Sequence, residues 1–152
     1  MLKPRDAIKE SDLVLVYGTL KKGEELHSVL DAAKFVGEGV TLQPFKLYHY
    51  SLGYPFAIPS EKGYPLKGEV YRIDASILSA LDYVEGYPHY YRRNLFKVKL
   101  DSGKYVVAWI YYVKSLPYTG THKVVEIKPV NGVLEWSGKN VYQFSRNPLD
   151  KS

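Results

Sequence analysis

Gly68-Glu-Val-Tyr-Arg-Ile-Asp-Ala-Ser-Ile-Leu-Ser-Ala-Leu-Asp-Tyr-Val-Glu-Gly-Tyr-Pro88 changes from a strand pattern to a helix pattern within one short stretch. Residues 68–73 alternate as a half-buried strand does, and apolar residues then recur at helical spacing. Asp74 is a suitable N-cap, and Gly86 with Pro88 supplies a stop. We therefore expect a strand that leads directly into one short amphipathic helix ending near Glu85.

Glu85 has an unusual position on this predicted helix. At about 100° per residue it projects roughly 20° from Leu78 and roughly 40° from Leu81, inside the apolar sector. Burial and the partial negative charge of a helix C-terminus both raise a carboxyl pKa, which makes Glu85 a candidate catalytic base. A structural role stays open, because a long Glu side chain can extend to water and helix ends shift by a residue.

Strand patterns dominate the rest of the chain. Expected strands cover 13–17, 41–50, 54–58, 95–100 and 105–113, and one further helix covers Glu24 to Leu30. The expected fold class is α+β, with a strongly curved sheet or small mixed β-barrel flanked by a few helices. We expect a single domain over 1–152, with a polar arm at 1–11 and a C-terminal extension at 129–152 that contains an Asn131-Gly132 turn.

Composition narrows the class of protein. The chain has no Cys, which excludes disulfides, thiolate metal sites and a Cys nucleophile and fits a cytoplasmic setting. The N-terminus has no apolar run suited to export, and no segment has the length of a membrane span, so no membrane partner is expected. The net charge is +5, but the basic residues are scattered, which indicates a solvated surface and not a nucleic-acid partner.

Tyr17-Gly-Thr-Leu-Lys-Lys-Gly23 follows a predicted buried strand. Free backbone amides collect where a strand ends and a helix begins, and Gly18 lets a ligand approach the chain. Glu24 stands where a Walker phosphate loop needs Lys, which excludes that nucleotide motif. A site for a small anion such as an amino-acid carboxylate remains, although such a segment is often only a turn.

Other candidate sites are weaker. The four His residues show no metal-ligand spacing, so no metal site is expected and each is placed on the surface or in a loop: His27, His49, His89 and His122. Glu69 is the rival carboxylate, but its alternating strand position predicts that it faces water. The chain has no Gly-x-Ser-x-Gly elbow for a hydrolase triad.

Four motifs, in order and at similar spacing, resemble the gamma-glutamylcyclotransferase-like superfamily, with the closer similarity to its gamma-glutamylamine cyclotransferase and AIG2-like branch. They are Tyr17-Gly-Thr-Leu-Lys21, Gly68-Glu-Val-Tyr71, Leu81-Asp-x-x-Glu85-Gly86 followed by Pro88, and Tyr91-x-Arg93. The resemblance covers roughly residues 13 to 113 and implies a small mixed β-barrel flanked by helices.

The resemblance also implies roles for individual residues. Glu85 would be the general acid/base, and Tyr17, Gly18, Thr19 and Leu20 would hold the α-amino-acid end of the substrate through main-chain amides. Tyr118, a possible counterpart of a later substrate-positioning Tyr, and Tyr91 complete the expected substrate-binding residues. Tyr91 and Arg93 match the motif, and packing and ion pairing stay open as their roles.

The implied reaction is an attack by the α-amine of a γ-glutamyl compound on its own γ-carbonyl, which gives 5-oxoproline and a free amine or amino acid. The nucleophile belongs to the substrate, so neither a cofactor nor a metal is needed. Two alternatives stay open: a binding or regulatory module that uses the same pocket for a small anion, and a basic protein associated with nucleic acid.

Overall fold

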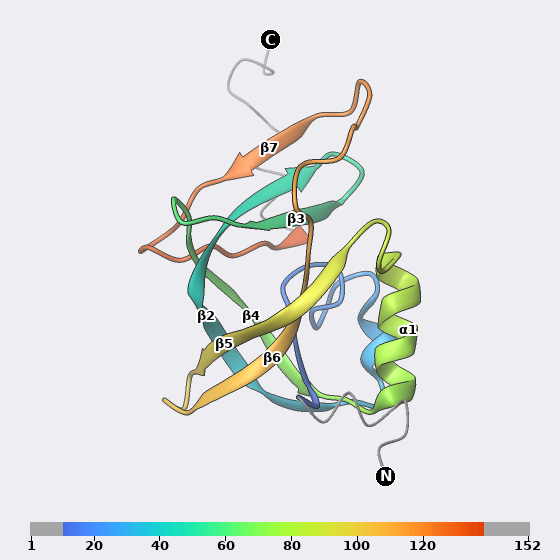
Figure 1. The fold of residues 1–152 in the computed structure, drawn as a ribbon, viewed down its shortest axis with the longest axis vertical. Coiled ribbons are helices and arrows are strands. Elements are labelled where there is room, and N and C mark those ends of the chain that lie inside the picture. The colour runs from blue at the N-terminus through green and yellow to red at the C-terminus, as the bar shows by residue number, and fades with distance from the viewer. Residues whose placement is uncertain (1–10, 139–152) are drawn as a thin grey trace.

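The structure, a computed structural model, describes residues 11–138 (Figure 1). The described strands are β1 (Leu13–Val16), β2 (Lys34–Tyr50), β3 (Tyr54–Pro59), β4 (Tyr64–Arg72), β5 (Arg92–Leu100), β6 (Tyr105–Tyr112) and β7 (Val124–Ile127). One α-helix, α1 (Ala75–Glu85), and a short 3-10 helix, η2 (His27–Leu30), pack beside them. None of the described helices has the length and apolar character needed to cross a membrane.

Five strands close into a barrel in the order β2, β4, β1, β6, β5, and β5 pairs with β2 to complete the circuit. The β1–β6 pair is parallel and the other pairs are antiparallel, so the barrel is mixed, as expected. The far half of β2 continues beyond the barrel, where it pairs with β3 and β7 (Figure 1).

Two glycines allow the barrel to close tightly. Gly39 on β2 lies opposite Gly68 on β4. A Cβ on Gly39 would lie 2.7 Å from a methyl carbon of Val98, and one on Gly68 would lie 2.6 Å from the carbonyl oxygen of Val16. Neither position has room for a side chain, because neighbouring strands approach the backbone closely there.

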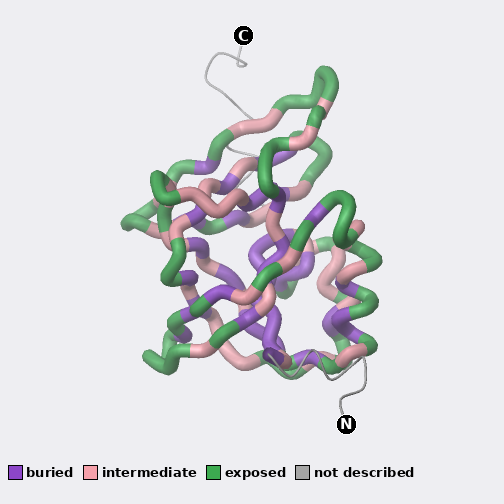
Figure 2. Tube along the Cα trace, in the orientation of Figure 1, coloured by how far each residue is buried: buried purple, intermediate pink, exposed green. Residues whose placement is uncertain are grey.

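The buried residues form two clusters, one built mainly from barrel-strand residues, and one that joins α1 and η2 to the other face of β1 and to aromatic residues of β2 and β3. Figure 2 shows buried positions along the barrel strands and along α1. Leu13 and Leu15 of β1 belong to the first cluster, and Val14 and Val16 belong to the second. Both faces of β1 are therefore buried, which explains why its sequence is a continuous apolar run without alternation. The predicted buried strand at the N-terminal side is confirmed.

The predicted α1 is also confirmed, including both ends. The Asp74 carboxylate accepts a hydrogen bond from the Ile77 N–H at 2.9 Å, and Gly86 ends the helix in the left-handed conformation at φ 66°. Ile77, Leu78 and Leu81 are the buried residues of the helix.

The helix predicted over Glu24 to Leu30 is wrong in extent, because only η2 forms. The preceding residues fold into turns: the Leu26 N–H donates to the Thr19 carbonyl at 2.8 Å, which pulls the chain back toward the end of β1. The Glu24 carboxylate is also engaged elsewhere, since it accepts a hydrogen bond from the Gly138 N–H at 3.1 Å. These contacts, one within the loop and one with the C-terminal segment, override a local helical pattern.

The described part of the C-terminal extension, 129–138, packs onto the barrel. Asn131 and Gly132 both have positive φ and join a bridge between Val130 and Val133, which confirms the predicted turn. Trp136 is only 1% exposed and belongs to the barrel core.

The remainder of the extension, 139–152, and positions 1–10 of the predicted polar arm lie outside the described residues. Ser11, assigned to that arm, is buried, and its hydroxyl donates to the Val107 carbonyl at 2.5 Å. For this residue the expectation of a polar arm was wrong, because the hydroxyl finds its partner in β6.

We expect Leu81→Ala to lower the free energy of unfolding by about 2–5 kcal/mol, because a fully buried side chain leaves a cavity between α1 and the barrel. Tyr83→Ala, on the same helix but 89% exposed, is the matched control and should change it by less than about 0.5 kcal/mol. Urea denaturation followed by circular dichroism measures both variants. Equal losses would contradict the packing described for α1.

Candidate functional site

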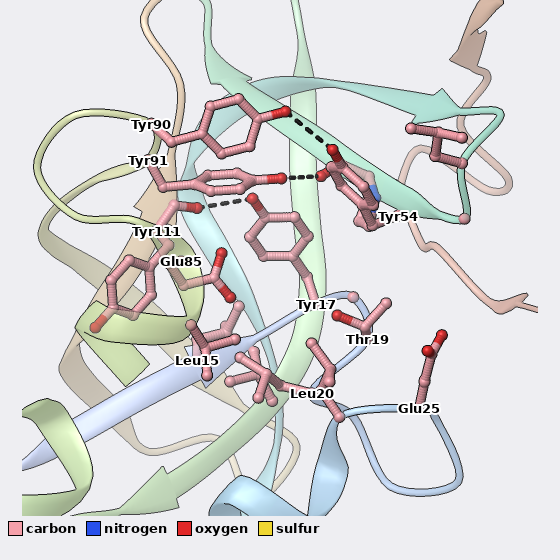
Figure 3. A pocket seen from close by; sticks show the side chains of 17 residues that line it. Leu15, Tyr17, Thr19, Leu20, Glu25, Tyr54, Glu85, Tyr90, Tyr91 and Tyr111 are labelled. Atoms are coloured by element: carbon pink, nitrogen blue, oxygen red, sulfur yellow. Dashed lines mark hydrogen bonds between the residues drawn. The ribbon is translucent and has the colours of Figure 1, made fainter. Parts of the chain in front are cut away.

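A cavity of about 370 Å³ opens where β1 ends, beside the last turn of α1 (Figure 3). Residues of β1 and its following loop form one wall, and the end of α1 with Tyr90 and Tyr91 forms another. The β2–β3 turn contributes residues 52–55, and Tyr111 of β6 completes the lining. The motifs singled out in the sequence at Tyr17 and Glu85 therefore meet around one cavity.

Glu85 is the last residue of α1, and its carboxylate points toward the cavity near the Tyr17 side chain (Figure 3). The side chain is partly buried, as the helical phase predicts. Burial raises the pKa of the Glu85 carboxyl to about 7. A carboxyl group that titrates near neutral pH can both accept and donate a proton under physiological conditions.

Tyrosines surround Glu85, and their hydroxyl groups are engaged. Tyr17 Oη donates to the Tyr111 carbonyl at 2.7 Å, and Tyr91 Oη donates to the Pro55 carbonyl at 2.6 Å. The hydroxyls of Tyr54 and Tyr90 lie 3.1 Å apart (Figure 3). Burial raises the pKa of each of Tyr17, Tyr90, Tyr91 and Tyr111, which keeps these hydroxyls neutral around the carboxylate.

The loop after Tyr17 has free main-chain donors. The N–H groups of Gly18, Thr19 and Leu20 have no hydrogen-bond acceptor within residues 11–138. Their carbonyl groups, in contrast, accept from Lys21 N–H, Leu26 N–H and, at 2.9 Å, the His27 ring. Three consecutive unpaired amides beside a cavity suit a carboxylate.

Gly18 also serves the packing of this wall. A Cβ there would lie 2.7 Å from Cγ of Pro55, so a side chain would push the loop away from the β2–β3 turn. The glycine thus lets two walls of the cavity approach each other, in addition to the ligand access expected from the sequence.

The structure brings most of the predicted site residues together. Tyr17, Gly18, Thr19, Leu20, Glu85 and Tyr91 all line the cavity. Tyr118 does not line it, and its side chain is 96% exposed on the segment between β6 and β7. Arg93 lies outside the lining and forms an ion pair with Asp82, the pairing role considered for it.

Glu69, the rival carboxylate, has a structural environment. Its Oε1 accepts hydrogen bonds from the Lys22 N–H at 2.8 Å and from Tyr71 Oη at 2.9 Å, and it does not line the cavity. The expectation that this carboxylate simply faces water overlooked both partners.

His49 is buried, so its expected surface or loop position was wrong. Its Nδ1 accepts a hydrogen bond from the Trp136 indole at 3.2 Å, and burial lowers the pKa of the imidazole. The described residues contain no group of three His, Asp or Glu side chains placed to hold a metal ion.

Sequence reasoning missed Tyr54, Tyr90, Tyr111 and Glu25 as lining residues. The tyrosines fall in three local clusters of the sequence, which was a usable signal, but Tyr is also a common strand residue. Glu25 gave no signal because it lay on a predicted helix. Glu25 and Glu85 are the charged side chains of the lining, and the described lining contains no Lys, Arg or His.

Comparison with known proteins gives consistent results. The sequence model for gamma-glutamyl cyclotransferase, AIG2-like, matches residues 14–129. A protein of Methanocaldococcus jannaschii is 39% identical over 102 residues, covering 66% of this chain and 83% of that protein. The human gamma-glutamylaminecyclotransferase is 36% identical over 96 residues, which cover 58% of this chain and 62% of the human protein.

A crystal structure of an AIG2-like protein from Mus musculus superposes with a TM-score of 0.64 at 30% identity, over 70% of this chain and 80% of that one. The expected mixed β-barrel is confirmed by this likeness and by the strand pairing. With its motifs gathered around one cavity and the family model matching most of its length, the chain belongs to the gamma-glutamyl cyclotransferase, AIG2-like family.

Proposed function

We propose that this protein converts a γ-glutamyl amine or γ-glutamyl peptide into 5-oxoproline and a free amine, with Glu85 as general acid/base. The observation that carries the proposal is the position of Glu85: a carboxyl group with a pKa of about 7 faces a small cavity next to three unpaired main-chain amides. A pocket that only binds an anion has no need of a desolvated carboxyl group in its wall.

The reaction requires two protons to leave the attacking nitrogen and two to reach the leaving nitrogen. Glu85 removes one proton from the substrate α-ammonium, and the resulting amine attacks the γ-carbonyl to form the C–N bond of a five-membered ring. Glu85 gives this proton to the leaving nitrogen as the bond between that nitrogen and the γ-carbon breaks. The Glu85 carboxylate then takes the second proton from the ring nitrogen and passes it to the departing amine, which leaves as an ammonium ion. A carboxyl pKa near neutrality serves both directions, because neither transfer is strongly uphill.

The cavity walls supply orientation. The amides of Gly18, Thr19 and Leu20 suit the α-carboxylate, and Glu85 then attracts the α-ammonium on the same carbon. A cavity of about 370 Å³ favours a folded substrate in which amine and γ-carbonyl are close. Holding the two groups together in this way removes much of the entropic cost of ring closure.

The charged side chains that line the cavity affect which leaving group is favoured. The α-carboxylate of the γ-glutamyl unit has the loop amides, but a second carboxylate on a leaving amino acid would meet Glu25 and no cation among the described lining residues. Burying a charge without a partner is unfavourable. We therefore propose that a γ-glutamyl amine without such a carboxylate is the better substrate.

The alternative is a non-catalytic module that binds a small anion in the same cavity. Incubation of the purified protein with γ-glutamyl amines, γ-glutamyl dipeptides and glutathione, followed by chromatography for 5-oxoproline, separates the two. Release of 5-oxoproline supports the enzyme. Binding detected by calorimetry without any release would establish the module instead.

Glu85→Gln should lower kcat for 5-oxoproline release by at least about 10²-fold, because the amide cannot relay the proton. Glu61→Gln, a change of the same type at an exposed turn, should leave kcat unchanged. Chromatographic detection of 5-oxoproline measures both. Undiminished release by Glu85→Gln would remove the proposed mechanism.

Glu85→Gln should also stabilise the fold at high pH. The pKa of Glu85 is about 7 in the folded state and about 4.5 in the unfolded state. As the pH rises from about 4.5 to 7, the unfolded state loses its proton while the native state keeps it, so the wild type loses free energy of unfolding over that window. Relative to the wild type, the variant should gain up to about 3 kcal/mol at pH 9 and little at pH 4. Urea denaturation at both pH values measures the difference. A pH-independent difference would contradict the raised pKa.

Two substrates that differ only by a carboxylate test the leaving-group preference. We expect a higher kcat/KM for γ-glutamyl-butylamine than for γ-glutamyl-norvaline. Glu25→Lys should shift that ratio toward the norvaline compound by up to about fivefold, the effect of an exposed ion pair. A wild type that prefers the norvaline compound would refute the preference without affecting the proposed chemistry.

A further inference from the structure

The last turn of α1 carries Glu85 but has little apolar anchoring of its own. The buried side chains of the helix are Ile77, Leu78 and Leu81, all before this turn. Tyr83 is 89% exposed and Val84 is 37% exposed. Hydrophobic packing therefore fixes the first two turns against the barrel. Polar contacts hold the third turn, and one of them is the hydrogen bond from the Tyr91 N–H to the Glu85 carbonyl at 3.2 Å.

Asp82 supplies the side-chain contacts that tie this turn to the barrel. Its Oδ1 accepts a hydrogen bond from Tyr111 Oη at 2.6 Å and another from Arg93 Nε at 2.8 Å, and its Oδ2 accepts from Arg93 Nη2 at 3.2 Å. Asp82 is three residues before Glu85 and thus close to the same helix face. The Asp82 carboxylate therefore links α1 to both β5 and β6.

Arg93 is itself held in a fixed orientation. Its guanidinium carbon lies 4.4 Å from the ring centre of Tyr87 and 4.4 Å from that of Trp109. The side chains of Arg93 and Asp82 are only 15% and 23% exposed, so their two-pronged contact is partly shielded from water. A shielded, bidentate pair restricts geometry far more than a surface ion pair does.

Tyr111 joins both walls of the cavity. Its hydroxyl points away from the cavity to Asp82, while its carbonyl accepts the hydrogen bond from Tyr17 Oη (Figure 3). The helix that carries Glu85 and the wall that begins at Tyr17 are therefore both hydrogen-bonded to the same residue of β6, the helix through Asp82. A shift of either wall relative to the other must strain one of these two short contacts.

We propose that Asp82, held by Arg93 and Tyr111, is a positioning residue that seats the last turn of α1 and so fixes the Glu85 carboxylate against the cavity wall. This inference rests on the proposed function for its meaning in catalysis, but the seating itself is a property of the unliganded protein. Loosening the turn would admit water to Glu85, and the pKa that burial raises would fall toward its ordinary value.

Other titratable groups near Glu85 do not obscure this effect. The neighbouring tyrosines have raised pKa values and stay neutral between pH 5 and 9. The charged groups that remain are Glu25 across the cavity, Asp82 and Arg93. The charges of Asp82 and Arg93 are preserved in the test, so that a change in the Glu85 pKa reports a change in burial and not a removed charge.

Two charge-preserving variants meet this requirement. Tyr111→Phe removes the hydroxyl and keeps the ring and the carbonyl, and Arg93→Lys keeps the cation but loses the two-pronged geometry. Tyr71→Phe is the matched control, because it removes a similar tyrosine–carboxylate hydrogen bond, from Tyr71 to Glu69, outside the cavity lining. Circular dichroism melting of all three variants shows how far each is destabilised.

The first readout is the Glu85 pKa, followed by NMR titration of the ¹³C-labelled carboxyl group in the unliganded protein. In Tyr111→Phe and Arg93→Lys it should fall by about 0.5 to 1 unit, and in Tyr71→Phe it should stay unchanged. The second readout is 5-oxoproline release. The pH at the midpoint of the acid limb of the rate profile should fall by the same amount. The value of kcat should fall about tenfold because the carboxylate is displaced.

Destabilisation without any movement of the Glu85 pKa, as in the control, would overturn the proposal and leave Asp82 a structural residue only. An upward movement would overturn it as well. These outcomes are separate from failure of the proposed function. A wild type that releases no 5-oxoproline refutes the function, whereas the NMR titration still decides whether Asp82 seats Glu85.

Discussion

Closure of the barrel through β2 is the constraint on which the rest of the structure depends. This strand pairs with β4 and β5 at once, so the five-stranded circuit has no free edge. Closure places β1 inside the wall with both faces buried, and it fixes where β1 ends. The loop from Tyr17 to Leu20 therefore emerges at a defined place, opposite the end of α1. The barrel geometry therefore determines where the cavity lies, and the site residues then line it.

The sequence predicts the parts of this structure that depend on local patterns. Asp74, Gly86 and the spacing of Leu78 and Leu81 are sufficient to locate α1 and to turn Glu85 inward. The anion-binding potential of the loop after Tyr17 is likewise local, because a strand end leaves amides unpaired.

The predictions that failed depend on tertiary contacts, most of them with partners far away in the chain. Turns replace the first part of the helix expected at Glu24 because Thr19 and Gly138 capture backbone and side-chain groups there. His49 is buried because Trp136, 87 residues later, covers it and donates to its ring. No local pattern carries that information. Tyr118 could be proposed for the cavity from motif order alone, but the segment that carries it leaves the barrel after β6.

Trp136 lies outside the stretch that the family model matches, but it belongs to the core of the barrel. The family model ends at residue 129, yet Leu134 and Trp136 are among the most deeply buried side chains of the barrel. The carbonyl group of Trp136 also accepts a hydrogen bond from the buried Lys21 ammonium, directly after the loop that lines the cavity. The interior of this barrel is thus completed by residues beyond the stretch that the family model matches. Folding of the ribosome-bound chain cannot reach its final packing until residue 136 has left the exit tunnel.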